Sequence, residues 1–245
     1  MELTIIRHGE SLNNKNQESA TLRVADPPLT DTGIAQAQAL GAWLASAPNL
    51  EDVVRAPLDS PKRDHGVRHT FTHLYCSAMR RALHTASLVG DAIDMTPEVW
   101  VDIHEHGGIW LAHNGRNAGQ PGITRRELAS EFPRVRPTDG VTDSGWWTSD
   151  GEEDIHACFA RASRVAAELR QRANRADSAQ DRIAIVSHGT FIDCLIKALS
   201  YRIPEDRFFH WHYNTGITRF DLHGDGVVVL RYVNRVTHLT PELIT

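Results

Sequence analysis

Short apolar runs alternate with longer amphipathic stretches along this chain. Residues 3–6 and 183–186 are continuous apolar runs, and a further strand is expected at about residues 71–76. Such runs are typical of central strands that are covered on both faces. Because helical patterns separate these strands, the chain is expected to form an α/β domain with a largely parallel central sheet.

Apolar residues at helical spacing mark the elements between the strands. One pattern begins at Thr30 and stops at Pro48, and another follows the strand near residue 76. Two capping boxes are expected to begin further helices, Thr124 with Glu127 and Ser149 with Glu152. The second box is expected to open a long helix. Its inward face consists of Ile155, Cys158, Phe159, Ala162, Val165 and Leu169.

Two segments differ from this regular alternation. Residues 223–226 separate two β-rich runs near the C-terminus, which predicts an antiparallel hairpin at the edge of the sheet. Residues 49–69 are polar and charged and contain two prolines, so we interpret them as a surface insertion. The sequence thus predicts one three-layer domain over residues 1–245, with helices on both faces of a mostly parallel sheet.

The net charge and the composition of the chain restrict the kinds of ligand and the cellular compartment that we expect. The formal net charge is −5 and charged residues make up 23% of the 245 positions, which argues against disorder and against a general nucleic-acid surface. An anionic ligand must therefore be bound by a local basic cluster. The three cysteines lack pairing or metal-ligand spacing, which favours a reducing compartment. No leader pattern or membrane-spanning run is recognisable, so a cytoplasmic protein without membrane contact is expected.

Polar residues follow two of the buried strands directly. Arg7 and His8 end the first strand, and His188 ends the strand at residues 183–186. In open α/β sheets, ligands bind beyond the carboxyl ends of the strands. Arg81, in the first turns of the helix after the second strand, is expected near the same edge. Arginine suits a phosphoryl group because its planar fork donates two parallel hydrogen bonds.

These residues belong to a set of motifs that resembles the histidine phosphatase superfamily, also called phosphoglycerate mutase-like. The matching motifs extend from Leu3 to about Leu199. They are Arg7-His8-Gly9-Glu10-Ser11; Pro28-Leu29-Thr30 leading to Gly33 and Gln36; Ser77 to Arg81-Ala82 with Thr85-Ala86; and Ser187-His188-Gly189.

The resemblance implies particular roles for residues of this chain. His8 is expected to form a phosphohistidine, with Arg7, Arg81 and His188 as the phosphate pocket. Asn14 stands at the position of an asparagine that the family carries just after the first motif.

The resemblance also implies an acidic proton donor after the third strand. Glu105 matches the glutamate of the family, and Asp102 is the competing candidate, less favoured because it stands earlier, inside or at the edge of the strand. His104, Glu105 and His106 alternate along an extended chain, and we interpret this short segment as poor geometry for chelating a metal. No metal and no cofactor are therefore expected, and the partner is a small phosphorylated substrate.

The motifs leave three functions to compare. The cofactor-dependent mutases of this family carry a Phe-Thr-Gly-Trp stretch after the first motif, and residues 15–26 lack it. Arg125 and Arg126 resemble the paired arginines with which mutases hold a substrate carboxylate, although an exposed helix turn is the favoured interpretation. A binding module without catalysis would not need a proton donor. A phosphomonoester hydrolase is therefore the predicted function, with a cofactor-dependent phosphoglycerate mutase as the alternative.

Specificity is expected to come from three loops over the crevice, at residues 15–27, 109–122 and 134–149. Trp110, Trp146 and Trp147 lie in or beside these loops. They are interpreted as packing residues in preference to platforms for an aromatic or sugar substrate.

Overall fold

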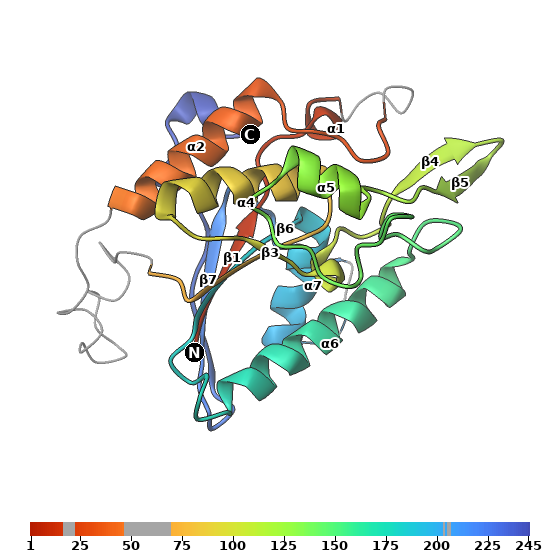
Figure 1. Cartoon of the computed structure of the whole chain (residues 1–245). Helices are drawn as coiled ribbons and strands as arrows, with labels where there is room; N and C mark the ends of the chain where they lie inside the picture. Colours follow the sequence, from red (N-terminus) through yellow and green to blue (C-terminus); the bar gives the residue numbers. More distant parts are fainter. Residues whose placement is uncertain (17–22, 47–69, 203, 205–206) are drawn as a thin grey trace.

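The computed structural model of the chain describes residues 1–16, 23–46, 70–202, 204 and 207–245 (Figure 1). The expected insertion at residues 49–69 lies outside the described residues. The strands are β1 (Glu2–Arg7), β2 (His73–Cys76), β3 (Glu98–Val99), β4 (Trp110–His113), β5 (Arg116–Gly119), β6 (Arg182–Ser187), β7 (Ile217–Leu222) and β8 (Val228–Arg235). The helices are α1 (Leu12–Lys15), α2 (Asp31–Ser46), α4 (Arg80–Ile93), α5 (Arg125–Glu131), α6 (Ile155–Ala173) and α7 (Gly189–Leu199), with short 3₁₀ turns η3 (Val101–Ile103) and η4 (Pro241–Leu243).

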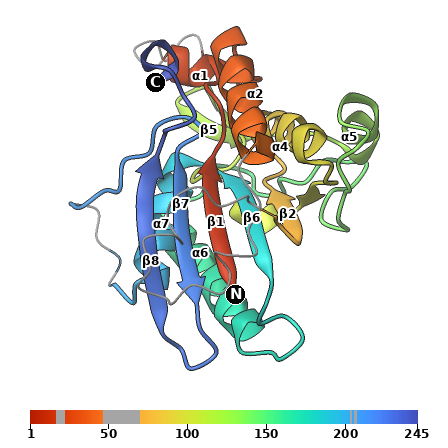
Figure 2. The same cartoon turned by 90° about the vertical axis from the view of Figure 1, so that its left-hand side faces the viewer.

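The described strands form a central sheet in the order β3-β2-β6-β1-β7-β8 (Figure 2). The first four of these strands are parallel to one another, whereas β7 runs antiparallel to β1 and β8 antiparallel to β7. The register places Arg7 at the end of β1 beside Ser187 at the end of β6. The mostly parallel sheet and its antiparallel edge hairpin are therefore confirmed. A second hairpin, β4–β5, forms a separate two-stranded sheet.

Helices cover both faces of the sheet, which confirms the three-layer prediction. In Figure 1, α2 and α4 lie on one side of the sheet and α6 and α7 on the other. Alternation along β1 explains the two cores, because Ile6 packs with the α2 and α4 side, whereas Leu3 and Ile5 pack with the α6 and α7 side. All three side chains are fully buried.

The helix that follows residue 150 begins later than the capping pattern predicts. Asp154 is the N-cap of α6, and its side chain accepts a hydrogen bond from the backbone N–H of Ala157 at 2.9 Å. Ser149 instead accepts from the N–H of Gly151, and Glu152 accepts from the Asn117 amide. The Ser149–Glu152 box was therefore wrong, because a second capping residue stands closer to the apolar face. The Thr124–Glu127 box is confirmed at α5.

No helix within the described ranges combines the length and the apolar character that crossing a bilayer requires.

Candidate active site

His8 stands where β1 ends, and its imidazole is held in a defined orientation. Its backbone N–H donates to the carbonyl of Ser187 on the neighbouring strand. The Nδ1 atom lies 2.6 Å from the carbonyl oxygen of Gly9, so Nδ1 carries the proton and donates it. This leaves Nε2 with its lone pair, and Nε2 accepts a hydrogen bond from Nε of Arg81 at 3.1 Å.

Burial and the neighbouring charges keep the His8 ring neutral. Burial lowers the pKa of His8 well below its usual value, and the adjacent Arg81 and Arg7 guanidiniums lower it further. The same causes, burial first and then Arg81, lower the pKa of His188. A neutral imidazole keeps a nitrogen lone pair, which a histidine nucleophile requires.

Gly9 is required for close packing. A Cβ at this position would lie 2.4 Å from the carbonyl oxygen of Gly33 in α2, and a Cβ on Gly33 would lie 2.1 Å from the carbonyl of Glu10. The two backbones therefore touch, which fixes the loop after His8 against α2. Gly189, after His188, differs, because a Cβ there would make an ordinary contact of 3.6 Å with Arg7.

Arg7, Arg81 and His188 lie around the His8 ring, as the sequence predicted. The Arg7 guanidinium donates to the carbonyl of His212, while its Nε has no partner within the described part of the chain. The ring of His188 is fully buried, its centroid is 4.9 Å from that of His8, and neither of its nitrogens has a partner among the described residues. A half-buried guanidinium, a buried one and an unpartnered imidazole thus surround the candidate nucleophile.

Burial lowers the pKa of Arg7 to about 10, which leaves this guanidinium charged at neutral pH.

Glu105 lies at the N-terminus of α7. Its Oε1 atom accepts from the backbone N–H of Phe191 at 3.0 Å, and its Oε2 atom is 3.3 Å from that of Thr190. Arg161 holds the preceding segment by donating to the carbonyls of Asp102 and His104. The Asp102 residue itself is exposed and does not line the cavity that contains His8.

The cavity around His8 has a volume of about 270 Å³. Its lining contains most of the predicted site, and it adds residues that the sequence did not single out. The lining residues are Arg7, His8, Ser11, Asn13, Asn14, Arg23, Ala25, Arg81, Glu105, His106, Gly108, Trp110, Glu152 and Thr190.

Asn14 lies in this cavity, but part of its side chain is already engaged. Its Oδ1 atom accepts from the backbone N–H and the hydroxyl of Ser11 at the start of α1. Asn214, which the sequence did not point to, donates from Nδ2 to the carbonyl of His8 at 3.0 Å. Only the sheet brings residue 214 beside residue 8, so no local pattern could have shown this contact.

Asp26 is a second residue that no sequence pattern singled out. Its carboxylate accepts from the backbone N–H of Arg80, the first residue of α4, and lies 3.9 Å from the Arg81 guanidinium. Burial raises the pKa of Asp26 to about 6, although the nearby Arg81 opposes that rise. Asp26 therefore supports the helix start that carries Arg81.

The remaining candidates lie outside the cavity or serve packing. Arg125 donates to the carbonyls of Thr138 and Val141, and the exposed Arg126 does not line the cavity. Trp146 is buried in the core, which agrees with the packing interpretation.

His104 and His106 lie apart in the structure, because the chain turns at residues 106–107. His104 is buried beside Trp146 and Trp147, whereas His106 lines the cavity.

The order of these residues along the chain is that of a known protein family. The sequence profile of the histidine phosphatase superfamily (branch 1) matches residues 3–59 and 64–235. The chain belongs to this superfamily, and it is an enzyme of the histidine phosphatase type.

Its relatives are phosphatases with different substrates in their names. The chain is 24% identical over 245 residues to the adenosylcobalamin/alpha-ribazole phosphatase of Salmonella typhimurium, covering 99% of this chain and all of the relative. Among solved structures it is similar to a mutant phosphoserine phosphatase of Entamoeba histolytica in complex with phosphoserine, with a TM-score of 0.57 and 24% identity over 98% of this chain and 99% of the other.

The ecdysone phosphate phosphatase of Bombix mori, solved with tungstate, gives a TM-score of 0.62 at 16% identity, over 93% of this chain and 91% of the other. At these identities the solved structures establish the shared fold.

Proposed function

We propose that the chain hydrolyses small phosphomonoesters through a phosphohistidine on His8. The observation that carries the proposal is the fixed orientation of this ring, with Nδ1 bonded to the Gly9 carbonyl and Nε2 directed toward Arg81. An incoming phosphoryl group replaces Nε2 as the partner of Arg81. The superfamily membership of the chain and the phosphatase activities in its relatives' names agree with this chemistry.

In the first step, Nε2 of neutral His8 attacks phosphorus, and the ester P–O bond breaks as the P–N bond forms. Arg7, Arg81 and His188 bind the non-bridging oxygens and stabilise their charge. Protonated Glu105 gives its proton to the leaving oxygen. In the second step, the Glu105 carboxylate takes a proton from water while the water oxygen attacks phosphorus, which releases inorganic phosphate and free His8.

No divalent metal is needed in this scheme. Metal ions often neutralise the phosphoryl charge in such reactions, and here Arg7 and Arg81 would supply that charge. We therefore expect turnover to persist in a chelator. Loss of turnover in the chelator, with recovery on adding zinc or magnesium, would contradict this part of the scheme.

Hydrolysis is favoured over mutase activity by the position of Arg125. Its guanidinium is bonded to carbonyls of its own chain at 2.9 Å and does not line the cavity, so it does not offer the substrate grip that a mutase requires. A ratio of 2- and 3-phosphoglycerate interconversion to phosphate release well above one, with 2,3-bisphosphoglycerate present, would favour the mutase.

Rapid-quench labelling tests the phosphohistidine. With p-nitrophenyl phosphate as substrate, we expect an acid-labile, base-stable phosphoenzyme whose label and turnover both disappear in His8→Ala. The exposed His113 on the β4–β5 hairpin gives the control, because His113→Ala should retain both. Label on Ser11 or Cys194, or binding of phosphate esters without turnover, would contradict the proposal.

A further inference from the structure

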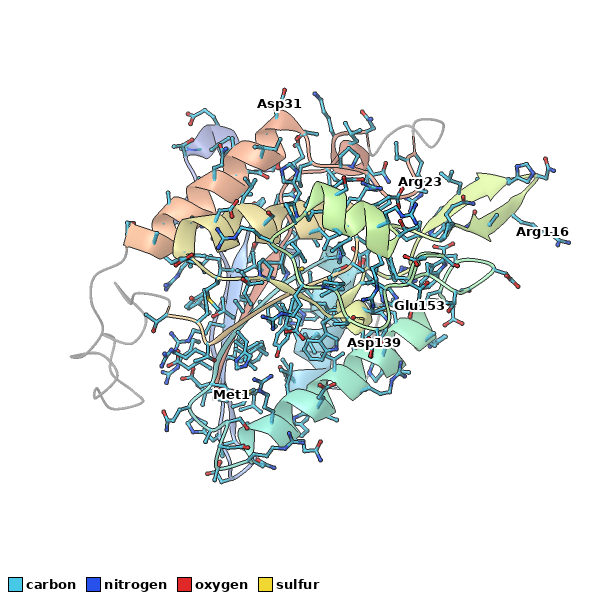
Figure 3. All side chains as sticks on the ribbon, viewed as in Figure 1. Met1, Arg23, Asp31, Arg116, Asp139 and Glu153 are labelled. Carbon is cyan, nitrogen blue, oxygen red and sulfur yellow. The ribbon has the colours of Figure 1, made fainter. Side chains whose placement is uncertain are left out.

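Arg23 is an exposed residue that lines the mouth of the His8 cavity. Its guanidinium carbon lies 3.9 Å from the centroid of the Trp110 ring, and both residues line the cavity. Within residues 1–16, 23–46, 70–202, 204 and 207–245, no hydrogen-bond or ion-pair partner of this guanidinium is found. Figure 3 shows Arg23 at the inner end of the β4–β5 hairpin, far from Arg116 at its outer tip.

The stacking on Trp110 fixes the guanidinium without using its hydrogen-bond donors. A cation over an indole face is attracted by the ring, and the five N–H groups of arginine remain in the plane of the guanidinium. Partial burial lowers the pKa of Arg23 from its usual value, whereas the carboxylates of Glu152 and Glu105 act in the opposite direction. The cavity edge therefore presents an oriented, charged donor whose N–H groups face solvent and the cavity, with no protein partner among the described residues.

The other charged side chains of the cavity already have a role in the proposed reaction or a hydrogen-bond partner within the chain. Arg7 and Arg81 adjoin His8 and serve the phosphoryl group, and Glu105 serves the leaving oxygen. Glu152 accepts from the Asn117 amide at 2.6 Å and lies against Gly107, away from ion-pair distance to Arg23 among the described residues. Arg23 is thus the cation that remains for a second group on the substrate.

The same stacking argues against an aromatic ligand. Because Arg23 covers one face of Trp110, that face is not free to stack on a base or a sugar. A cavity of about 270 Å³ lies near the lower end of the size range for ligand pockets, which suits a small phosphorylated compound.

We propose that Arg23, held on Trp110, binds a carboxylate on the leaving group, which makes phosphorylated small hydroxy acids the preferred substrates. One carboxylate matches one guanidinium fork with two parallel hydrogen bonds, and a dianionic second phosphate would leave charge uncompensated near Glu152. The assignment of the leaving group rests on the hydrolysis proposed above. The carboxylate site uses Arg23 and Trp110, whereas the arginine pair of α5 lies elsewhere.

A matched substrate pair tests this specificity. 3-Phosphoglycerate and glycerol 3-phosphate have the same number of carbons and differ in a carboxylate against a hydroxymethyl group. We expect kcat/KM to favour 3-phosphoglycerate by about 10–100-fold, the range for a hydrogen bond to a charged group. Arg23→Gln should remove this preference by lowering kcat/KM for 3-phosphoglycerate alone, and Arg23→Lys should restore part of it.

Two controls separate Arg23 from general charge and from the fold. Arg116→Gln makes the same charge change at the exposed tip of the hairpin and should leave the ratio unchanged. Trp110→Leu retains Arg23 but removes its support, so it should reduce the ratio less than Arg23→Gln does. A ratio that Arg23→Gln does not change, or an equal loss with both substrates, would overturn the assignment.

Binding measurements keep the inference testable if the chain proves inactive. In His8→Ala, calorimetric titration with 3-phosphoglycerate and glycerol 3-phosphate compares their affinities without turnover. A weaker 3-phosphoglycerate affinity in His8→Ala/Arg23→Gln supports the carboxylate site even where hydrolysis fails. Equal affinities of the two ligands in His8→Ala overturn it even where hydrolysis succeeds.

Discussion

Nε of Arg81 lies 3.1 Å from Nε2 of His8 and donates a hydrogen bond to it. The two side chains are 8% and 2% exposed, so solvent does not compete for this contact. The guanidinium thus stabilises the neutral ring and stands beside the position that a phosphoryl group would take. The pairing joins the end of β1 to the first turn of α4 and makes the site sensitive to the shape of residue 81 as well as to its charge.

Replacing Arg81 by lysine tests whether the planar shape of the guanidinium matters in addition to its charge. Lysine keeps the charge but loses the planar fork, so Arg81→Lys should lower kcat by about 10²–10³-fold, the scale for losing an oriented donor to the transition state. The neighbouring Arg80 gives the control, because its side chain pairs with Glu127 and Glu131 at the surface. Steady-state kinetics in which Arg80→Lys and Arg81→Lys behave alike would contradict the role of Arg81.

The contribution of Glu105 to the rate of hydrolysis is expected to depend on the leaving group of the substrate. Glu105→Gln cannot donate a proton, so hydrolysis of an alkyl phosphate should fall by about 10²–10⁴-fold, whereas the phosphorylation step with p-nitrophenyl phosphate should fall less. Single-turnover rates with both substrates measure the difference. Asp102→Asn is the control, because Asp102 is exposed and should show nearly unchanged rates. Equal losses with both substrates would indicate a purely positional role for Glu105.

Replacing Gly33 by alanine tests the backbone contact that fixes the loop after His8. Replacing a glycine within a helix by alanine usually stabilises the helix by about 1 kcal/mol. Here the added Cβ would lie 2.1 Å from the carbonyl of Glu10, so Gly33→Ala should instead destabilise the fold by about 1–3 kcal/mol and lower activity. Gly224→Ala meets only an ordinary 3.6 Å contact and serves as the control in denaturant unfolding.

Asp26 is expected to make stability depend on pH. Its pKa is raised from 3.8 to about 6 by burial, so the folded chain holds this proton more tightly than the unfolded chain does. Its contribution to stability is therefore most favourable below about pH 4, declines as the pH rises to about 6, and is constant above that. Arg80 and Arg81 favour the ionised form, and Glu131 opposes it.

Asp26→Asn removes this titration. The free energy of unfolding of the variant, relative to the wild type, should increase by up to about 3 kcal/mol between about pH 4 and pH 7. Denaturant unfolding at several pH values measures this change, with the exposed Asp91→Asn as a control. A difference that does not vary with pH would show that Asp26 ionises normally.

The centre of the site was predictable because it depends on strand ends. An apolar run that ends in Arg7-His8 places those side chains at a known edge of a parallel sheet, and the motif order supplied Arg81, His188 and Glu105. The alternation of strands and helices likewise predicted both helical layers. What local pattern cannot give is a contact between distant segments, such as that of Asn214 with the His8 carbonyl.

The other errors of the sequence predictions have two causes: competing capping residues, and loop residues that carry no periodic pattern. Ser149 and Asp154 are both good capping residues, and packing of the apolar face selected Asp154. Asp26 and Arg23 lie in a polar loop without periodicity, so neither the contact of Asp26 with α4 nor the stacking of Arg23 on Trp110 could be predicted from the sequence. The residues closest to His8 and two of the loops over them, 15–27 and 109–122, were therefore predictable from the sequence, whereas the contacts that Arg23 and Asp26 make were not.

The floor and the mouth of the cavity also come from different parts of the architecture. His8, Arg81 and His188 extend from core elements, whereas Trp110 belongs to the two-stranded sheet that lies outside the central one. Mutations in that hairpin can accumulate without disturbing the core that fixes the nucleophile. Natural selection can in this way retain one reaction while exchanging one phosphate ester for another, and descendants of a single ancestor can come to serve unrelated metabolic needs.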